Sequence, residues 1–286
     1  MTEYRVFSLY IREKNYIYDT YLQCQKKILD FINTFDLPKP ETLMNIITVA
    51  NESEQYFKLK GLVNEAEKYG ILIQEHTYKM QYKKDDMSKA HFFELKLNIY
   101  GKSDYTESYQ TEYNDFYCRE CDTHQYTPKG ELYINKTEFR RKDIAVSNNL
   151  NNEIIISDKL KKLIEADGLT GASFYPAHHY NDRLKDDYPA WRLAVRSIMP
   201  PIDPSMPVNI LEQYCPICKR HHILPLSYVR YKKSDTEGAS DFNLSAESFG
   251  PGWYGSPKLI VSRKAYDLIR DNKIKGCRFE IVGERI

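Results

Sequence analysis

The sequence predicts an α+β protein, with a mainly helical N-terminal region over residues 1–88 and a mixed α/β region over residues 89–286. Three observations lead to this fold class. Apolar residues recur at spacings of three and four in the first ninety or so residues, as in amphipathic helices. Apolar and polar residues begin to alternate near Lys89, which indicates strands. Two segments of the second region also match each other and predict a duplicated strand–helix–strand unit.

Three helices are expected in the N-terminal region. The first follows an apolar stripe over residues 17–35, and Pro38 and Pro40 end it. The second begins near Pro40, and the third covers residues 53–69 with Gly70 as its C-terminal stop. The expected buried sides consist of Ile17, Tyr21, Cys24, Ile28, Phe31 and Phe35, then Leu43, Ile46, Ile47 and Ala50, then Leu59, Leu62, Val63 and Ala66.

The second region begins with a pattern of period two. Apolar residues from Phe93 to Ile99 alternate with polar ones, which predicts a half-buried strand. Short strands are also expected at residues 131–135 and 143–147. The polar segment 82–89 is the candidate linker, so we place the boundary at residue 88.

Residues 155–174 and 260–279 form an internal repeat. They align without a gap at an offset of 105, and seven of the twenty positions are identical, where composition alone would give about one. Ser157 and Ser262 suit helix N-caps, because a hydroxyl there can accept a backbone N–H of the first turn. Each copy is therefore expected to form a strand, a helix and a second strand, within a pseudo-symmetric core or two similar lobes.

Glycine recurs at the end of each predicted helix. Gly171 and Gly276 permit the turn into the following strand, because glycine adopts backbone conformations that other residues avoid. Cys277 follows in the second copy where the first copy has Ala172, so we expect a packed core thiol there.

Two Cys-x-x-Cys pairs indicate a metal site. They are Cys118-Arg-Glu-Cys121 and Cys215-Pro-Ile-Cys218, with 93 residues between them. Each turn places two thiolates on one side of an ion, and two such turns complete the tetrahedral shell of zinc. We expect one structural zinc of the zinc-ribbon kind, held by all four cysteines. Redox disulfides within each pair, and reduced thiols without metal, are the alternatives.

Histidines follow both pairs at the same distance. His124 follows the first pair, and His221 with His222 follows the second, so two separate zinc ions are conceivable. Four cysteines already satisfy a single ion, which makes the shared site the favoured interpretation. A zinc closed by four thiolates keeps no position open for water, and such a site is not catalytic.

Charge and hydropathy exclude some functional classes. The formal net charge of +1 argues against a nucleic-acid partner and against binding to anionic lipid. No apolar run approaches the roughly 18 residues that span a bilayer, and the first residues do not form a signal peptide. We therefore expect a cytoplasmic protein without a membrane partner, with its thiols reduced.

The enzyme signals are weak. His178 and His179 with Asp182 invite a metal or acid–base interpretation, but adjacent residues on an extended segment point apart. A phosphate-binding loop, a His-Glu-x-x-His motif and a Gly-x-Ser-x-Gly motif are all absent from the sequence. The loop at residues 247–257, with Trp253, is either a recognition loop or a cover over the core edge.

Residues 110–286 resemble the double-CXXCG-motif immunity proteins of bacterial polymorphic toxin systems. The resemblance is carried by the two cysteine pairs, by both copies of the repeat, and by the segment Tyr188-Pro-Ala-Trp-Arg-Leu193 between the pairs. As in that family, the final copy lies at the C-terminal end and closes with Phe279-Glu-Ile-Val282. Asp122 and Lys219 stand where the family has glycine, and glycine is not a zinc ligand.

The resemblance implies a binding protein rather than an enzyme. Such a protein binds a cognate protein toxin and neutralises it, and one zinc per chain stabilises the scaffold through Cys118, Cys121, Cys215 and Cys218. The alternative is a zinc-ribbon nucleic-acid-binding or regulatory protein, which would show strongly salt-dependent affinity. An enzyme that uses His178 and His179 is the third possibility.

Overall fold

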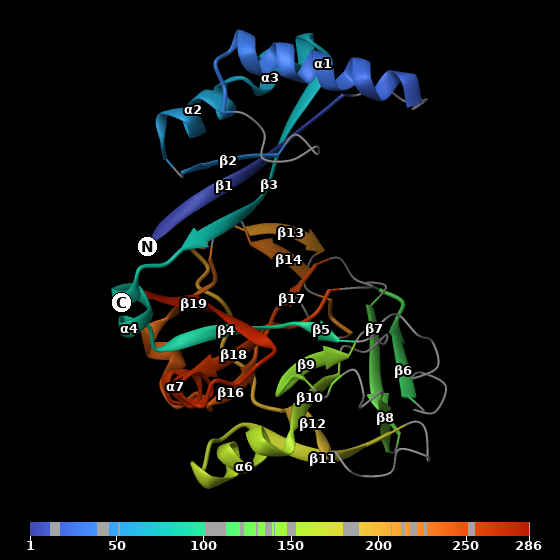
Figure 1. Cartoon of the computed structure of the whole chain (residues 1–286), viewed down its shortest axis with the longest axis vertical. Helices are drawn as coiled ribbons and strands as arrows, with labels where there is room; N and C mark the ends of the chain where they lie inside the picture. Colours follow the sequence, from blue (N-terminus) through green and yellow to red (C-terminus); the bar gives the residue numbers. More distant parts are fainter. Residues whose placement is uncertain are drawn as a thin grey trace. The chain divides into compact units, whose positions relative to one another are not determined.

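The chain divides into two compact units. The computed structural model describes residues 1–11, 18–38, 46–50, 52–100, 113–120, 123–129, 131–134, 139, 141–147, 153–179, 189–206, 208–212, 215–217, 222–225, 228–250 and 255–285. The first unit comprises Met1–Ser88 with Leu226–Tyr228, and the second comprises Lys89–Pro225 with Val229–Ile286 (Figure 1).

The first unit contains an antiparallel sheet covered by helices. Its described strands lie in the order β2-β1-β3, with β1 in the middle. The core is formed where Phe7 and Leu9 of β1 meet Phe31 and Ile32 of α1. The elements are β1 (Thr2–Ile11), α1 (Tyr18–Thr34), β2 (Ile46–Ala50), α2 (Glu54–Gly61), α3 (Val63–Lys68) and β3 (Ile71–Gln81).

The predicted α+β fold with a mainly helical N-terminal region is wrong, because strands outweigh helices over the described residues of the chain and the N-terminal region contains the β2-β1-β3 sheet. The first predicted helix corresponds to α1, but the sequence analysis missed β1 and β3 and placed a helix where β2 lies. In β2 the alternate residues Ile47 and Val49 are buried, and its β-branched side chains favour a strand. The third predicted helix is divided at Leu62 into α2 and α3, and Gly70 follows α3 with a φ of +69°.

The second unit is built around two larger sheets. Among the described strands, one sheet has the order β5-β9-β10-β12-β11-β8 and the other has the order β15-β19-β4-β18-β16. The first comprises β5 (Ile99–Tyr100), β8 (Leu132–Ile134), β9 (Ile144–Ser147), β10 (Ile154–Ser157), β11 (Ala172–His179) and β12 (Ala190–Val195). The second comprises β4 (Phe92–Leu97), β15 (Arg230–Lys232), β16 (Phe242–Leu244), β18 (Leu259–Ser262) and β19 (Cys277–Arg285).

Smaller elements complete the described part of this unit. The strand β6 (Tyr113–Cys118) pairs with β7 (Thr123–Pro128). A further sheet has the order β13-β14-β17. Its strands are β13 (Val208–Glu212), β14 (His222–Pro225) and β17 (Ser248–Phe249). In this unit η3 (Lys233–Thr236) follows β15. The short helix α4 (Lys84–Lys89) crosses the division at residue 88 and occupies the segment that we expected to be a linker.

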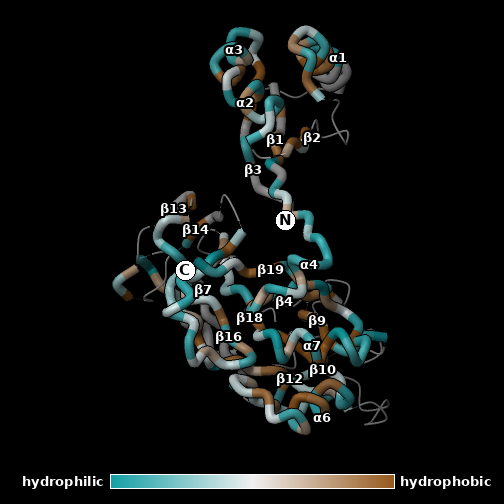
Figure 2. Tube along the Cα trace, turned by 90° about the vertical axis from the view of Figure 1, so that its left-hand side faces the viewer, coloured by the Kyte–Doolittle hydropathy of each residue, from teal (hydrophilic) through white to brown (hydrophobic). Residues whose placement is uncertain are grey.

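Each copy of the repeat forms a strand, a helix and a strand. The first copy is β10, α6 (Asp158–Ala166) and β11, and the second is β18, α7 (Arg263–Asp271) and β19. Ser157 caps α6 by accepting from the Leu160 amide at 3.3 Å, and Ser262 caps α7 by accepting from Ala265 at 3.2 Å. The isoleucines of β10 are fully or half buried, and the tube of Figure 2 marks this stretch as hydrophobic.

None of the helices in the described residues is long and apolar enough to cross a membrane.

Candidate metal centre

The first cysteine of each pair lies at the end of an antiparallel hairpin. Cys118 is the last residue of β6 and pairs with Thr123 of β7, so it lies at the tip of the β6–β7 hairpin. Cys215 lies between β13 and β14, which are also antiparallel. In each case the strand ladder fixes where the chain reverses, and the reversal presents the first cysteine of the pair.

The two hairpin tips meet. The Sγ atoms of Cys118 and Cys215 are 3.4 Å apart, and these residues are 1% and 2% exposed. A disulfide would need about 2.05 Å between the sulfur atoms. A tetrahedral zinc with Zn–S bonds of about 2.3 Å has sulfur–sulfur edges of about 3.8 Å. The spacing therefore fits two ligands of one tetrahedral ion much better than it fits a disulfide.

The described residues supply two of the four predicted ligands. Cys121 and Cys218 lie outside the described residues, and within the described part of the chain no group of three His, Cys, Asp or Glu side chains surrounds a common point. The structure therefore brings together one cysteine from each pair. The pairing runs between the distant motifs, as a shared site requires.

Of the histidines that follow the cysteine pairs, His222 is the one whose side chain is described. The side chain of His222 is fully buried, and its Nδ1 lies 3.2 Å from the carbonyl oxygen of Gly250. His222 also pairs with Ser248 of β17, which attaches the second cysteine hairpin to the beginning of the 247–257 loop. His221 and the side chain of His124 lie outside the described residues.

The sequence analysis missed the contact between His222 and Gly250. The clustering of glycines after Ser248 was the available signal, because glycine marks places where backbone segments approach closely. Trp253 lies outside the described residues, so both interpretations of the 247–257 loop remain predictions.

The other cysteines have no described partners of this kind. Cys277 is half buried rather than part of the core, and burial, aided by the carboxylate of Asp143, raises the pKa of its thiol to about 11. The thiol is therefore protonated at neutral pH and is a poor ligand or nucleophile. Cys24 lies in α1, and its side chain is outside the described residues.

The two adjacent histidines of β11 do not form an acid–base pair in the described residues. The Nε2 atom of His178 is 3.7 Å from Oε1 of Glu131, beyond hydrogen-bonding distance, and its ring lies 5.7 Å from that of Tyr133. His179 follows on the same strand, and Asp182 lies outside the described residues. The described side chains around His178 therefore give no support to a catalytic centre.

Comparison with known proteins does not add a family. No family model matches this chain, and no curated protein matches it.

Proposed function

We propose that this protein is an immunity protein that binds and neutralises a cognate bacterial toxin, on a scaffold stabilised by one structural zinc. The observation that supports it most is the approach of Cys118 and Cys215, because it joins the two motifs that carry the resemblance. Cys118, Cys121, Cys215 and Cys218 would hold the ion. Zinc closed by four thiolates would contribute folding free energy and no catalysis.

The remaining residues of the resemblance lie in the same unit as the cysteines. Ala190–Leu193 of the Tyr-Pro-Ala-Trp-Arg-Leu segment lie in β12, and both repeat copies flank central strands of the two large sheets. A scaffold that gathers all of these motifs favours one binding domain over separate modules.

Exposed apolar side chains next to the cysteines suggest where a protein partner binds. Tyr117 precedes Cys118 and is 45% exposed, and Ile217 follows Cys215 by two residues and is 56% exposed. Large apolar and aromatic side chains that are exposed beside a buried site are typical anchors of protein interfaces. We therefore place the toxin-binding surface at the hairpin tips.

The test is a toxicity rescue. The product of the adjacent upstream gene is expressed in a laboratory host with and without this chain, and growth is measured. We expect the neighbour to stop growth and the chain to restore it. Ile217→Asp should lose rescue, whereas Ile198→Asp should retain it, because Ile198 is 68% exposed but pairs with Leu244 of β16 and belongs to neither cysteine hairpin.

Two results would contradict the proposal. One is a neighbour that kills equally well in the presence of this chain. The other is a harmless neighbour together with salt-dependent binding of this chain to DNA or RNA, which would favour the zinc-ribbon regulator.

A further inference from the structure

The two large sheets of the second unit share one plan among their described strands. In each, both strands of the repeat copy are antiparallel to a strand that lies between them: β12 between β10 and β11, and β4 between β18 and β19 (Figure 1). Outside these, β9 and β16 are antiparallel to the first repeat strand, and β8 and β15 are parallel to the second.

The residue registers are also the same. Ile155 pairs with Arg192, and its counterpart Ile260 pairs with Glu94. Counting along the central strands, Phe92 corresponds to Ala190, which lies 98 residues later. The outer strands have the same offset, because Ile156 pairs with Ile144 and its counterpart Val261 pairs with Phe242.

The cysteine hairpins share nearly the same offset. Cys118 precedes Cys215 by 97 residues, and both belong to hairpins that follow the central strand of a copy. Along the chain, the order β4, β6, β7, β8, β9, β10, α6, β11 recurs as β12, β13, β14, β15, β16, β18, α7, β19, apart from the short β5 and β17. Each copy of the duplication is therefore longer than the twenty-residue repeat, and it begins with β4 or with β12. The first strand of each copy thus lies in the sheet of the other copy.

The contacts between the copies occur in equivalent pairs. Asp143 accepts from the cap hydroxyl of Ser157 at 3.2 Å and from the amide of Lys275 in the other copy at 2.9 Å. Asp241 accepts from the cap hydroxyl of Ser262 at 2.6 Å and, at 2.8 Å, from the Thr170 amide of the other copy. Contacts that occur twice in this way define a two-fold interface.

Lysines from the two helices repeat the pattern. The Nζ of Lys159 donates to the carbonyl oxygen of Asn272 at 3.0 Å, and the Nζ of Lys264 donates to that of Asp167 at 2.7 Å. These four residues are equivalent at the offset of 105, so the second unit has the internal symmetry of a homodimer.

One ion pair occurs in both sheets with its charges reversed. Glu153 binds Arg192 of the exchanged strand β12 at 2.7 Å. At the equivalent positions, Lys258 binds Glu94 of the exchanged strand β4 at 2.5 Å. If each first strand lay in the sheet of its own copy, Glu94 would face Glu153 and Arg192 would face Lys258. These side chains are 10–22% exposed, so solvent would screen the like charges only weakly.

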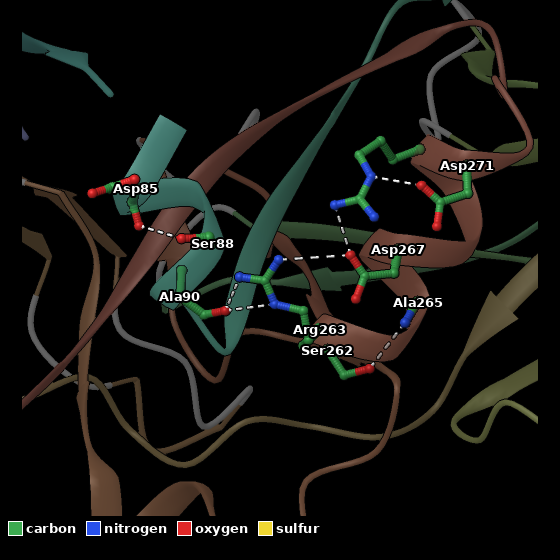
Figure 3. Close-up of polar contacts among 9 residues, drawn as sticks. Asp85, Ser88, Ala90, Ser262, Arg263, Ala265, Asp267 and Asp271 are labelled. Carbon is green, nitrogen blue, oxygen red and sulfur yellow. Dashed lines mark hydrogen bonds and ion pairs between the residues drawn. The ribbon is translucent and has the colours of Figure 1, made fainter. Parts of the chain in front are cut away.

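The first residue of each helix also makes a favourable contact with the strand that comes from the other copy. Asp158 of α6 accepts from Nε1 of Trp191 at 3.1 Å. Its counterpart Arg263 of α7 donates through Nε to the carbonyl oxygen of Ala90 at 2.8 Å (Figure 3). The guanidinium of Arg263 also lies 4.7 Å from the ring centre of Phe93. In unexchanged sheets, Asp158 would face a phenylalanine, which has no hydrogen-bond donor.

We propose that the second unit is a tandem duplication whose copies have exchanged their first strands, and that the reversed ion pairs select the exchanged pairing over the unexchanged one. Like charges at both positions disfavour the alternative, while opposite charges stabilise the observed sheets. This is specificity by repulsion as well as by attraction. It depends on the residues of the two sheets and not on the proposed toxin or zinc.

Cross-linking tests the exchange directly. In a Cys277→Ala background, the pair Lys96→Cys with Arg278→Cys should be linked by a short bis-maleimide, because these residues are register partners. The matched control is Lys96→Cys with Ser173→Cys, where Ser173 is the counterpart of Arg278 in the other sheet. Peptide mass spectrometry should find the first link and not the second. The reverse result would overturn the exchange.

Charge reversal tests the selection. Glu94→Arg with Arg192→Glu keeps the net charge but places like charges in both sheets, and it should lower the melting temperature by about 10 °C. Adding Glu153→Arg and Lys258→Glu should restore most of that loss. A shift of the cross-link to Ser173 in the double variant would also support the proposal. Full stability of the double variant with the original cross-link, or no recovery in the fourfold variant, would overturn it.

Discussion

Replacing Gly171 with alanine should destabilise the second unit far more than the same replacement at Gly238. Both glycines have a φ of +84°, so the backbone strain is matched, at about 1–2 kcal/mol. A Cβ on Gly238 would have no atom within 4 Å. A Cβ on Gly171 would lie 2.1 Å from the carbonyl oxygen of Phe242, which belongs to the other copy of the repeat.

The additional cost follows from the contacts that this collision disturbs. Bringing the two atoms to 3.0 Å requires a shift of about 0.9 Å. Four hydrogen bonds join the segments that must separate. They are Phe242 N to Thr170 O at 3.0 Å, Thr170 N to Asp241 Oδ2 at 2.8 Å, Thr170 Oγ1 to Asp241 Oδ2 at 3.1 Å, and Asp241 N to Thr170 Oγ1 at 3.1 Å. At about 1 kcal/mol each, Gly171→Ala should cost about 4 kcal/mol beyond the Gly238→Ala control.

Urea unfolding followed by tryptophan fluorescence measures this difference. Both tryptophans of the chain, Trp191 and Trp253, belong to the second unit, so the signal reports on that unit alone. The expected result is a clearly lower midpoint for Gly171→Ala than for Gly238→Ala, with similar slopes. Equal midpoints for the two variants would refute the close approach of the two copies at this turn.

Three further outcomes are expected. Cys118→Ser and Cys215→Ser should each lose the bound zinc, measured by inductively coupled plasma mass spectrometry. Each should also lose a large part of the roughly 10 kcal/mol of folding free energy that a structural zinc contributes. A full equivalent of zinc retained in either variant would contradict the shared site. Burial raises the pKa of Cys277 from 9.0 to about 11, so the stability that its neutral thiol contributes is complete below pH 9. As the pH rises towards 11, the free energy of unfolding should fall by up to about 2 kcal/mol. Urea titrations of Cys277→Ala at the same pH values should lack this fall. Ser157→Ala and Ser262→Ala should each cost about 1 kcal/mol through the lost N-cap. The loss should be larger at Ser262, because its hydroxyl donates to Asp241 at 2.6 Å whereas that of Ser157 donates to Asp143 at 3.2 Å. Equal thermal shifts in calorimetry would argue against a stronger bond at Ser262.

The sequence predicted the elements whose pattern is local and strong. Ile28 and Phe31 of the predicted stripe belong to α1, and the serine caps are in place because each follows an apolar strand. The sequence failed where two periods compete over a short apolar run. Residues Ile46 and Ile47 fit either a helix or a strand, and the pairing of β2 with β1 decides the matter through contacts that are distant in the sequence.

The missed strands of the first unit had a readable signal. Phe7 and Leu9 alternate on one face of β1, and Ile71 and Ile73 do the same in β3. Within each strand, the polar residues that alternate with these apolar ones resemble a loop when one segment is considered alone. The pairing of β1 with β3 shows that the alternation separates the two faces of a sheet.

The candidate metal centre was predictable in part for a similar reason. The spacing within each cysteine pair is local, whereas the joining of Cys118 to Cys215 depends on two hairpins that meet across the fold. The full extent of the duplication was hidden by a change of offset. It is 97 at the cysteines, 98 at β9 and β16, and 105 at the helices, so an ungapped comparison finds the last part alone. Extra residues between β16 and β18, where β17 lies, account for the shift.

The duplication in turn explains why the cysteine pairs are 93 residues apart. One Cys-x-x-Cys hairpin supplies half of a tetrahedral shell, so a single copy could not close a zinc site by itself. Cys118 and Cys215 occupy equivalent positions in the two copies, and equivalent residues come within 3.4 Å of each other only close to a two-fold axis. The proposed zinc would therefore join the copies at that axis, while the exchanged strands join them through the sheets. These two connections between the copies use different residues, because the proposed zinc ligands take no part in the ion pairs that select the exchange.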